Sequence, residues 1–350
     1  MSVFTVSNVK ITGISACVPK NKIATGTYKN FSKEEKELFI KTTGIEFRRV
    51  AEAGVTSSDL CAKSAEELLR KLNWDRSEIE TLVFVTQTPD YLIPCTSTIL
   101  QDRLSLPKSC MTIDINLGCS GYVYGLATAA SLISNTSGKK GLLLVGDIAS
   151  RTVSEEDKSV APIFSDAGSA TALQHAEGEN MHFNLQSDGS GYDAIITPDG
   201  GMKSPFSAHS LKMQQVEDGI KRNRLHTILN GVEVFNFSLR EVAPNVRELL
   251  EYIDKSTDEI DYFVFHQANQ LMNNAICRKL KFEKNKMPLS LKEFGNTSCA
   301  TVPVTMVSEL QNELENRSLS LVLSGFGVGL SWGSAVVNTC QIACPEMIEI

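Results

Sequence analysis

Cys119 has the sequence setting that most favours nucleophilic chemistry. It lies in the motif GCSG, residues 118–121, between a strand-like segment and a helical segment rich in alanine. Glycines on both sides permit a tight strand-to-helix turn that directs one side chain into a cavity. A helix N-terminus also favours the thiolate, which is the reactive form of cysteine. The motif therefore indicates a nucleophile, although these residues alone also fit a buried structural cysteine in a tight turn.

Two further polar residues occur where catalytic groups are often found. His266 follows the apolar segment 262–265 in the motif HQAN, and Asn296 lies in the glycine-led motif GNTS. In open α/β folds, functional side chains gather in loops at the ends of strands. Taken singly, the histidine could be a structural residue and the asparagine a helix cap.

The elements that would position these residues alternate along the chain as in an α/β fold. The expected strands are Leu82–Thr86, Thr112–Asn116, Leu142–Val145, Tyr262–Phe265 and Leu319–Leu323. The expected helices are Ser57–Leu72, Gly121–Ile133, Val242–Ile253 and Leu271–Leu280. Pro244 is expected in the first turn of the third helix, where its missing N–H is harmless.

A weak internal repeat suggests that the chain has two similarly folded halves. The segment SEIETLVF at 77–84 resembles DEIDYFVF at 258–265, and Ile79 and Ile260 are 181 residues apart. The segment LLLVG at 142–146 has a counterpart, LVLSG, at 321–325. Chance similarity between apolar strands is the alternative, but both matches have nearly the same offset. We expect halves at 1–175 and 176–350.

Composition excludes several other classes of protein. A chain of 350 residues with 42% apolar and 21% charged residues is typical of an ordered globular protein. Its net charge of −7 argues against nucleic-acid binding. No signal peptide or apolar segment of about 20 residues is present, so we expect a cytoplasmic location and no membrane association. The nine cysteines are spaced singly, without a CxxC pair, which predicts buried reduced thiols and no metal site.

The four motifs GCSG, HQAN, GNTS and FGVGLSWG, the last at 326–333, together resemble the β-ketoacyl-acyl-carrier-protein synthase III family of the thiolase superfamily. The resemblance covers nearly the whole chain. It implies a thiolase fold, with two βαβαβαββ-type halves stacked in five layers, α-β-α-β-α, and a homodimer.

The resemblance also implies an acyltransferase with a two-step reaction. Cys119 would accept an acyl group from a thioester, and a malonyl thioester would then lose carbon dioxide and attack that group. His266 and Asn296 would donate hydrogen bonds to the malonyl thioester oxygen, and the backbone N–H groups of Cys119 and Val328 would form a second oxyanion hole. Coenzyme A or acyl-carrier-protein thioesters would be substrates, acyl carrier protein would be a partner, and no cofactor would be permanently bound.

The expected tunnel entrance departs from the family pattern. The family's tryptophan and basic positions there carry residues without an aromatic surface or a cation, namely Leu38, Thr42, Asn236 and Leu271. Lys158, Arg278 and Lys279 remain as candidate phosphate partners. Because a coenzyme A nucleotide would lose stacking and ion pairs, we expect a carrier protein to deliver one or both substrates, or coenzyme A to bind differently.

Two basic clusters could bind an acidic carrier protein. One is KRNR at 221–224, which includes Arg222, and the other extends from Arg278 to Lys286. An ordinary solvated surface is the alternative for both clusters.

The function expected is decarboxylative condensation in fatty-acid or specialised lipid biosynthesis. Acyl transfer to an alcohol or amine on the same fold is a second possibility, and a catalytically silent partner subunit is a third. The sequence does not define the acyl chain length or branching, and it gives no account of the tail, residues 341–350.

Overall fold

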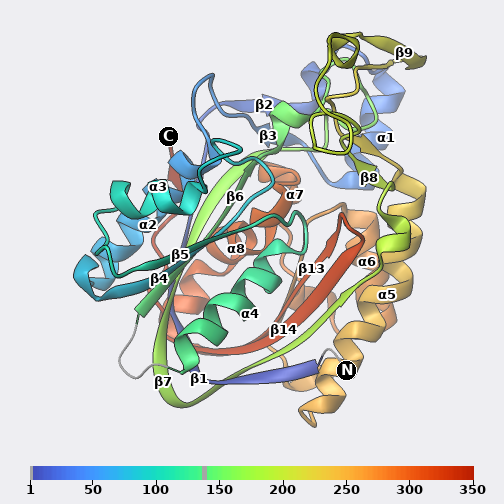
Figure 1. Ribbon diagram of the computed structural model, residues 1–350. Coiled ribbons are helices and arrows are strands. Elements are labelled where there is room, and N and C mark those ends of the chain that lie inside the picture. The colour runs from blue at the N-terminus through green and yellow to red at the C-terminus, as the bar shows by residue number, and fades with distance from the viewer. Residues whose placement is uncertain (1–2, 136–139) are drawn as a thin grey trace.

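Two long strands run through both halves of the molecule in the computed structural model, which describes residues 3–135 and 140–350. Strand β1 (Val3–Val18) pairs antiparallel with β7 (Asp166–Ser187) along most of its length. The first part of β7 pairs with β6 (Lys140–Ile148), and its last part pairs with β14 (Ser331–Cys340). β7 therefore joins the strands of the two halves into one sheet system (Figure 1).

The strand order on the main path is β12-β13-β14-β7-β6-β4-β5. The strands not yet given are β4 (Ile79–Val85), β5 (Met111–Ile115), β12 (Tyr262–Phe265) and β13 (Ser318–Gly327). β4 runs parallel to β5 and β6, and β12 runs parallel to β13. Short pairs lie outside this sheet: β2 (Lys22–Ala24) with β3 (Phe47–Arg49), β8 (Ile195–Ile196) with β11 (Ile228–Leu229), and β9 (Gln214–Glu217) with β10 (Ile220–Arg222).

Helices form three layers around the sheets. The central helices are α4 (Gly121–Ser134) and α8 (Thr301–Asn316). One outer layer holds α2 (Ser57–Leu72) and α3 (Thr96–Arg103), and the other holds α5 (Gly231–Tyr252) and α6 (Gln270–Leu280). Two shorter helices, α1 (Lys33–Thr43) and α7 (Leu291–Phe294), complete the set. The layers follow the expected thiolase-type arrangement (Figure 1).

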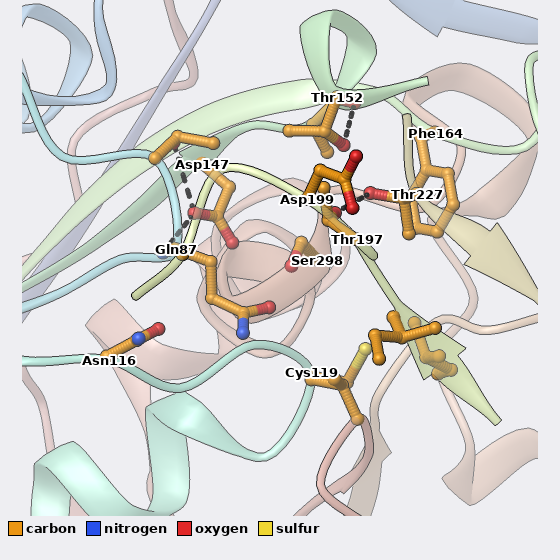
Figure 2. A pocket seen from close by; sticks show the side chains of 16 residues that line it. Gln87, Asn116, Cys119, Asp147, Thr152, Phe164, Thr197, Asp199, Thr227 and Ser298 are labelled. Atoms are coloured by element: carbon orange, nitrogen blue, oxygen red, sulfur yellow. Dashed lines mark hydrogen bonds between the residues drawn. The ribbon is translucent and has the colours of Figure 1, made fainter. Parts of the chain in front are cut away.

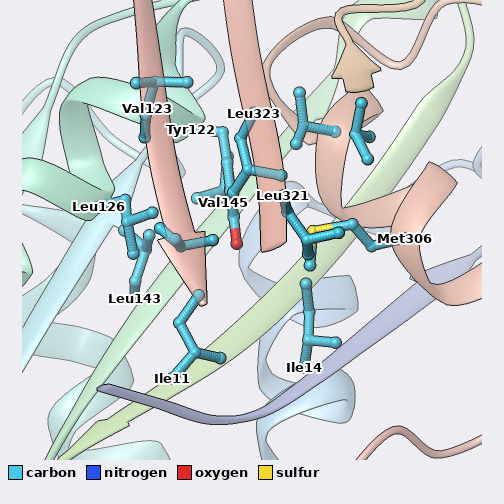
Figure 3. Packing of buried hydrophobic residues seen from close by; sticks show 14 of the residues in the cluster. Ile11, Ile14, Tyr122, Val123, Leu126, Leu143, Val145, Met306, Leu321 and Leu323 are labelled. Atoms are coloured by element: carbon cyan, nitrogen blue, oxygen red, sulfur yellow. The ribbon is translucent and has the colours of Figure 1, made fainter. Parts of the chain in front are cut away.

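Alternating burial along the strands explains this layering. In β4, Val83 belongs to the core around α4, whereas Leu82 belongs to the core beneath α2. In β13, Leu321 and Leu323 face the central layer, and Val322 faces α5 and α6. Successive strand residues point to opposite faces, so strands buried on both faces read as continuous apolar runs. Figure 3 shows the central packing, where both halves contribute to one core.

The sequence predicted most elements to within a few residues, and α2 and β12 have the predicted bounds. The exception is α5, which begins eleven residues before the predicted start, because Asn230 caps it by accepting a hydrogen bond from the N–H of Glu233. The placement of Pro244 in a first turn was therefore wrong, since it lies inside the helix. Its exposed position lets the unpaired carbonyl of the preceding turn face solvent.

The repeat predicted from sequence has a structural counterpart. The matched segments form β4 and β12, and each is preceded by a short 3-10 helix, Arg76–Glu78 or Thr257–Glu259. Each lies beside a parallel strand, β6 or β13, from the second matched segment. Residues 175 and 176 both lie within β7, so the division of the chain there stays a prediction.

The C-terminal tail, residues 341–350, extends the sheet. Strand β15 (Ile348–Glu349) pairs parallel with the end of β1, and Arg49 forms an ion pair with Glu349 at 2.9 Å. Ile342 and Cys344 are buried. The tail is thus an integral part of the packing around β1.

None of the helices in residues 3–135 and 140–350 has both the length and the apolar character that a membrane span requires. The cytoplasmic location expected from the sequence stays a prediction.

Candidate active site

The turn that carries Cys119 joins β5 to α4, as the sequence predicted. Cys119 is 8% exposed and lies directly before Ser120, the residue that caps α4. The hydroxyl oxygens of Ser120 and Ser331 are 2.7 Å apart, and Ser331 also donates to the carbonyl of Val328 at 2.8 Å. These contacts tie the cysteine turn of the first half to the loop between β13 and β14 of the second.

Glycines are required here by close approach. A Cβ atom added at Gly327 would lie 2.7 Å from Cβ and 2.8 Å from Sγ of Cys119. A Cβ at Gly118 would lie 2.4 Å from Oε1 of Gln87 and 2.6 Å from a methyl group of Val328. Gly118 does not adopt a positive φ angle. The glycines beside the thiol therefore leave space for neighbouring segments of the same chain, in addition to permitting the tight turn expected from sequence.

Burial sets the protonation state of Cys119. It raises the pKa of the thiol to about 11. Smaller effects act in both directions: the backbone N–H groups of Val328 and Cys119 lower the pKa, and the carboxylate of Asp147 raises it. The N–H groups at the helix N-terminus favour the thiolate, as expected from the sequence, but desolvation outweighs them and favours the neutral thiol.

His266 lies at the end of β12, where its backbone N–H donates to the carbonyl of Ser324 at 2.7 Å. The side chain is buried, and burial lowers the pKa of the imidazole to about 3, although the backbone of Ser298 opposes this shift. The ring is therefore neutral at physiological pH. Its Nδ1 atom lies 2.7 Å from the hydroxyl of Thr301. The same hydroxyl lies 3.2 Å from the carbonyl oxygen of Ser298, so its one proton can serve either contact. When that proton is directed to Nδ1, Nε2 carries the ring proton and can donate to a substrate.

Asn296 is held by backbone contacts on both sides. Its N–H donates to the carbonyl of Ile163 at 3.0 Å, and its carbonyl accepts from the N–H of Ser165 at 2.9 Å. The side-chain Oδ1 accepts from the N–H of Ser298 at 2.9 Å. A backbone N–H can bond only to the oxygen of the carboxamide, so the amide nitrogen points away from that bond as a donor.

A cavity of about 470 Å³ opens on the thiol of Cys119. Val328 and Ser298 also line it, and Figure 2 shows the thiol and Ser298 at the same cavity. Ser298 is the residue whose backbone contacts both the imidazole of His266 and the carboxamide of Asn296. Ser298 thus connects the imidazole and the carboxamide to the cavity that holds the thiol, although His266 and Asn296 themselves do not line that cavity. A catalytic role for the three residues together stays a prediction.

The four cations proposed from sequence as phosphate or carrier contacts differ in their surroundings. Lys158 forms an ion pair with Glu35 at 2.9 Å. Arg222 pairs with the buried Asp157 at 2.7 Å. Such pairs leave less positive charge for a ligand.

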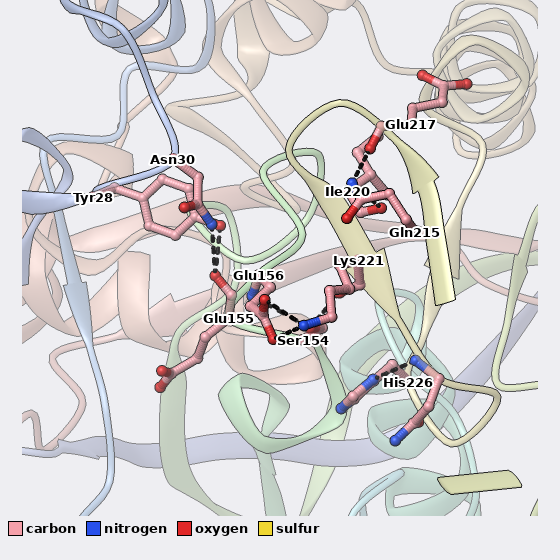
Figure 4. Close-up of polar contacts among 11 residues, drawn as sticks. Tyr28, Asn30, Ser154, Glu155, Glu156, Gln215, Glu217, Ile220, Lys221 and His226 are labelled. Atoms are coloured by element: carbon pink, nitrogen blue, oxygen red, sulfur yellow. Dashed lines mark hydrogen bonds and ion pairs between the residues drawn. The ribbon is translucent and has the colours of Figure 1, made fainter. Parts of the chain in front are cut away.

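The rest of the cluster at 221–224 is neutralised in the same way. Lys221 pairs with Glu156 at 3.0 Å, as Figure 4 shows, and Arg224 pairs with Asp199 at 2.9 Å. Near these pairs, Tyr28 donates a hydrogen bond to the carbonyl of Glu155. The carboxylates come from other segments of the chain, which the local sequence could not reveal.

Arg278 and Lys279 lie in the last turn of α6 and are both exposed. Lys279 donates to the carbonyl of Leu239 at 2.7 Å, and Arg278 forms no ion pair with a carboxylate in the described part of the chain. Leu38 of α1 is 61% exposed and Leu271 of α6 is 48% exposed. Their assignment to the family's entrance positions stays a prediction.

Sequence reasoning missed several residues of the cavity wall. Asp147 lies near the C-terminal end of β6, where strand-end reasoning could have found it. Thr301, which contacts His266, begins a helix, α8, so its position at a strand end could not have indicated it. The segment 195–201 and Thr227 also line the cavity, and they reach it only through the pairing of β8 with β11.

The raised thiol pKa predicts the pH dependence of Cys119 alkylation. Because only the thiolate reacts, the rate with iodoacetamide should rise about tenfold per pH unit from pH 7 to 10, without a plateau. Peptide mass spectrometry separates this site from the exposed Cys95 and Cys340. Cys119→Ala should lose the signal, and a plateau below pH 9 would contradict the assigned burial effect.

Comparisons with known proteins agree with this geometry. Residues 113–189 match the family described as 3-Oxoacyl-[acyl-carrier-protein (ACP)] synthase III, and residues 250–339 match its C-terminal counterpart. The chain is 34% identical to a putative 3-oxoacyl-[acyl-carrier-protein] synthase 3 of Campylobacter jejuni, covering 94% of this chain and 93% of that one. It is 30% identical to a β-ketoacyl-[acyl-carrier-protein] synthase III of Streptococcus gordonii, covering 94% and 98%.

A solved structure of a 3-oxoacyl-(acyl-carrier protein) synthase from Burkholderia xenovorans superposes with a TM-score of 0.93 at 35% identity, covering 99% of both chains. This similarity confirms the fold class predicted from sequence. The chain belongs to the 3-oxoacyl-acyl-carrier-protein synthase III family of thiolase-fold condensing enzymes, which are acyltransferases by class.

Proposed function

We propose that this enzyme joins an acyl group carried on Cys119 to a malonyl thioester, with His266 and Asn296 as hydrogen-bond donors. The observation that supports this proposal is the position of Ser298 on the wall of the cavity that holds the thiol. The thiol lies under the N–H of Val328, while Ser298, on the same cavity, contacts both proposed donors. Fatty-acid biosynthesis is the proposed setting, and specialised lipid biosynthesis is an alternative.

The first step is acyl transfer to Cys119. The sulfur attacks the thioester carbonyl as its proton leaves, the carbon–sulfur bond to the donor breaks, and the donor leaves as a thiol. Negative charge develops on the carbonyl oxygen during this attack. The N–H groups of Cys119 and Val328 support a role as the oxyanion hole, because both are oriented toward the thiol.

The second step is decarboxylation and condensation. The malonyl thioester loses carbon dioxide, and the resulting enolate attacks the acyl carbonyl and displaces the sulfur of Cys119. Neutral donors stabilise the enolate oxygen without forming an ion pair with the malonyl carboxylate, which must leave. The neutral imidazole of His266 and the amide of Asn296 have this character.

Separate substitutions should divide the two steps. Cys119→Ala should abolish the covalent acyl adduct, measured by intact mass after incubation with an acyl thioester. His266→Ala and Asn296→Ala should retain the adduct but release carbon dioxide from malonyl-carrier protein about 100- to 1,000-fold more slowly, since each removes one donor.

Thermal unfolding of each variant controls for loss of fold. Normal carbon dioxide release by both donor variants would refute their roles. An adduct in the native enzyme without any decarboxylation would instead favour acyl transfer to an alcohol or amine.

We further propose that acyl carrier protein delivers at least the malonyl substrate and docks beside α6. The exposed cations Arg278 and Lys279 support this surface, as do the exposed apolar residues Leu38 and Leu271. An acidic carrier would be steered by the charges, and the apolar residues would contact it directly. These apolar residues offer neither stacking nor charge to a coenzyme A nucleotide.

Charge reversal should test this docking site. The variant with Arg278→Glu and Lys279→Glu should raise the KM for malonyl-carrier protein about tenfold, while the KM for malonyl-pantetheine stays unchanged. The double variant Lys10→Glu with Lys20→Glu, at two exposed positions in and after β1, changes the net charge by the same amount and is the matched control. Equal effects on both substrates would contradict docking, and priming by acetyl-coenzyme A with micromolar affinity would remove the basis for a carrier-borne acyl donor.

A homodimer is proposed on the free edge of the sheet. β5 ends the described strand order, and its Met111 and Ile113 are 44% and 41% exposed. In the nearby loop, Tyr91, Leu92 and Ile93 are 62%, 87% and 88% exposed. An exposed apolar edge strand readily pairs with another chain, so a second copy is the proposed partner.

Light scattering should give a native mass near twice the 38.3 kDa of one chain. Ile113→Lys should shift the protein toward the monomer, because a charge would be buried in the interface. Leu211→Lys replaces another exposed apolar residue, 56% exposed, and should leave the mass unchanged. A monomeric native enzyme would refute the dimer.

A further inference from the structure

The cavity above Cys119 has a polar wall. Nine of its 16 lining residues have polar side chains: Gln87, Thr88, Asn116, Asp147, Thr152, Thr197, Asp199, Thr227 and Ser298. Pockets that bind alkyl chains are lined mainly by apolar side chains, because each buried polar group needs a hydrogen-bond partner. Several of these groups already have partners in the protein, such as Thr197 with Thr227 and Asp199 with Arg224. A group with spare hydrogen-bonding capacity is therefore the one that can select a substrate.

Asp147 is the most unusual member of this wall. It is 1% exposed, and its Oδ1 atom accepts hydrogen bonds from the N–H of Gln87 at 2.7 Å and from the hydroxyls of Thr86 and Thr88 at 3.0 and 3.2 Å. Its Oδ2 atom accepts only from the thiol of Cys299, at 3.1 Å, among the bonds of the described residues. A thiol is a weak donor, so Oδ2 retains capacity for a stronger one.

Other buried carboxylates nearby differ from Asp147 in having a cation. Asp157 pairs with Arg222 at 2.7 Å, and Asp199, on the same cavity, pairs with Arg224 at 2.9 Å. Asp147 forms no ion pair within residues 3–135 and 140–350. A buried carboxylate is stabilised by a charge partner or a full set of donors. A bound molecule can provide the missing donor.

The position of Asp147 relates it to the acyl group. Both residues line the same cavity, and the carboxylate of Asp147 raises the pKa of the Cys119 thiol. Figure 2 shows the carboxylate and the carboxamide of Gln87 facing the cavity that also contains the sulfur. A group attached to the sulfur would extend into the space that these polar side chains surround.

We propose that Asp147 selects an acyl group whose chain bears a hydrogen-bond donor, a hydroxyl or an ammonium group. This inference rests on the proposed function, in which Cys119 carries the acyl group. Asp147 accepts the donor through Oδ2, and the carboxamides of Gln87 and Asn116 provide polar neighbours. The substrate class is thus a substituted acyl thioester instead of a simple fatty acyl thioester.

Three acyl groups of equal size test the proposal. Pantetheine thioesters of isovalerate, 3-hydroxybutyrate and 3-aminobutyrate differ only in a methyl, hydroxyl or ammonium group at one carbon. The rate of adduct formation on native Cys119, followed by intact mass, should be at least about tenfold higher for the hydroxyl or the ammonium probe than for isovalerate. The faster probe identifies the donor. Equal rates, or faster loading of isovalerate, would overturn the proposal.

Asp147→Asn keeps an oxygen for the contacts of Oδ1 and replaces the acceptor at Oδ2 with a donor. The preference for the ammonium probe should disappear, and that for the hydroxyl probe should fall severalfold. Asp114→Asn is the matched control, because Asp114 also accepts hydrogen bonds from backbone N–H groups but does not line the cavity, and it should retain the native preference. If Asp147→Asn changes the rate of adduct formation by the same factor for all three probes, Asp147 has only a general effect on the thiol, and selection of the acyl group by Asp147 is refuted.

The native comparison needs no variant, so misfolding of Asp147→Asn would leave the test intact. Failure of this inference differs from failure of the proposed function. Equal loading of all probes with normal release of carbon dioxide from malonyl-carrier protein would refute only the selection by Asp147. Absence of any adduct on Cys119 would refute the proposed function itself.

Discussion

The close approach of two backbone segments at the thiol is the constraint on which the rest of the site depends. A Cβ atom at Gly325 would lie 2.7 Å from the carbonyl oxygen of Cys119, and one at Gly327 would lie equally close to its Cβ atom. Side chains at either position would separate the two halves. Because both positions are glycine, the N–H of Val328 reaches the sulfur. The fold and the proposed oxyanion hole therefore depend on the same contact.

Burial shifts the pKa values of Cys119 and His266 in opposite directions, and both shifts favour the neutral form of the side chain. It raises the pKa of the thiol to about 11 and lowers that of the imidazole to about 3, so both groups are neutral when substrate is absent. A thiolate–imidazolium pair would require two charges in a desolvated cavity. The site thus differs electrostatically from a cysteine protease, and the negative charge arises only when a thioester is attacked or decarboxylated.

The sequence could predict the features that depend on local patterns. Glycines beside Cys119, strand ends before His266, and apolar strands of the repeat are all read from short segments. The ion pairs of Arg222 and Arg224 could not be predicted, because their carboxylates, Asp157 and Asp199, come from distant segments. The neutral state of the thiol could not be predicted for a related reason, since a helix end is visible in sequence and the degree of burial is not.

The position of Asp147 near the end of a strand could have been used to predict it as a residue of the site. Asp147 lies near the C-terminal end of the apolar strand β6, and His266 directly follows β12. The two strands belong to different halves, and α4 and α8 pack between them. The end of β6 lines the cavity through Asp147, and the end of β12 is linked to it by the contact of His266 with Ser298. In the proposed arrangement, the first half supplies the nucleophile and the side chain that selects the acyl group. The second half supplies the donors for decarboxylation. Acyl selectivity can therefore change through the first half without altering the groups that promote carbon–carbon bond formation.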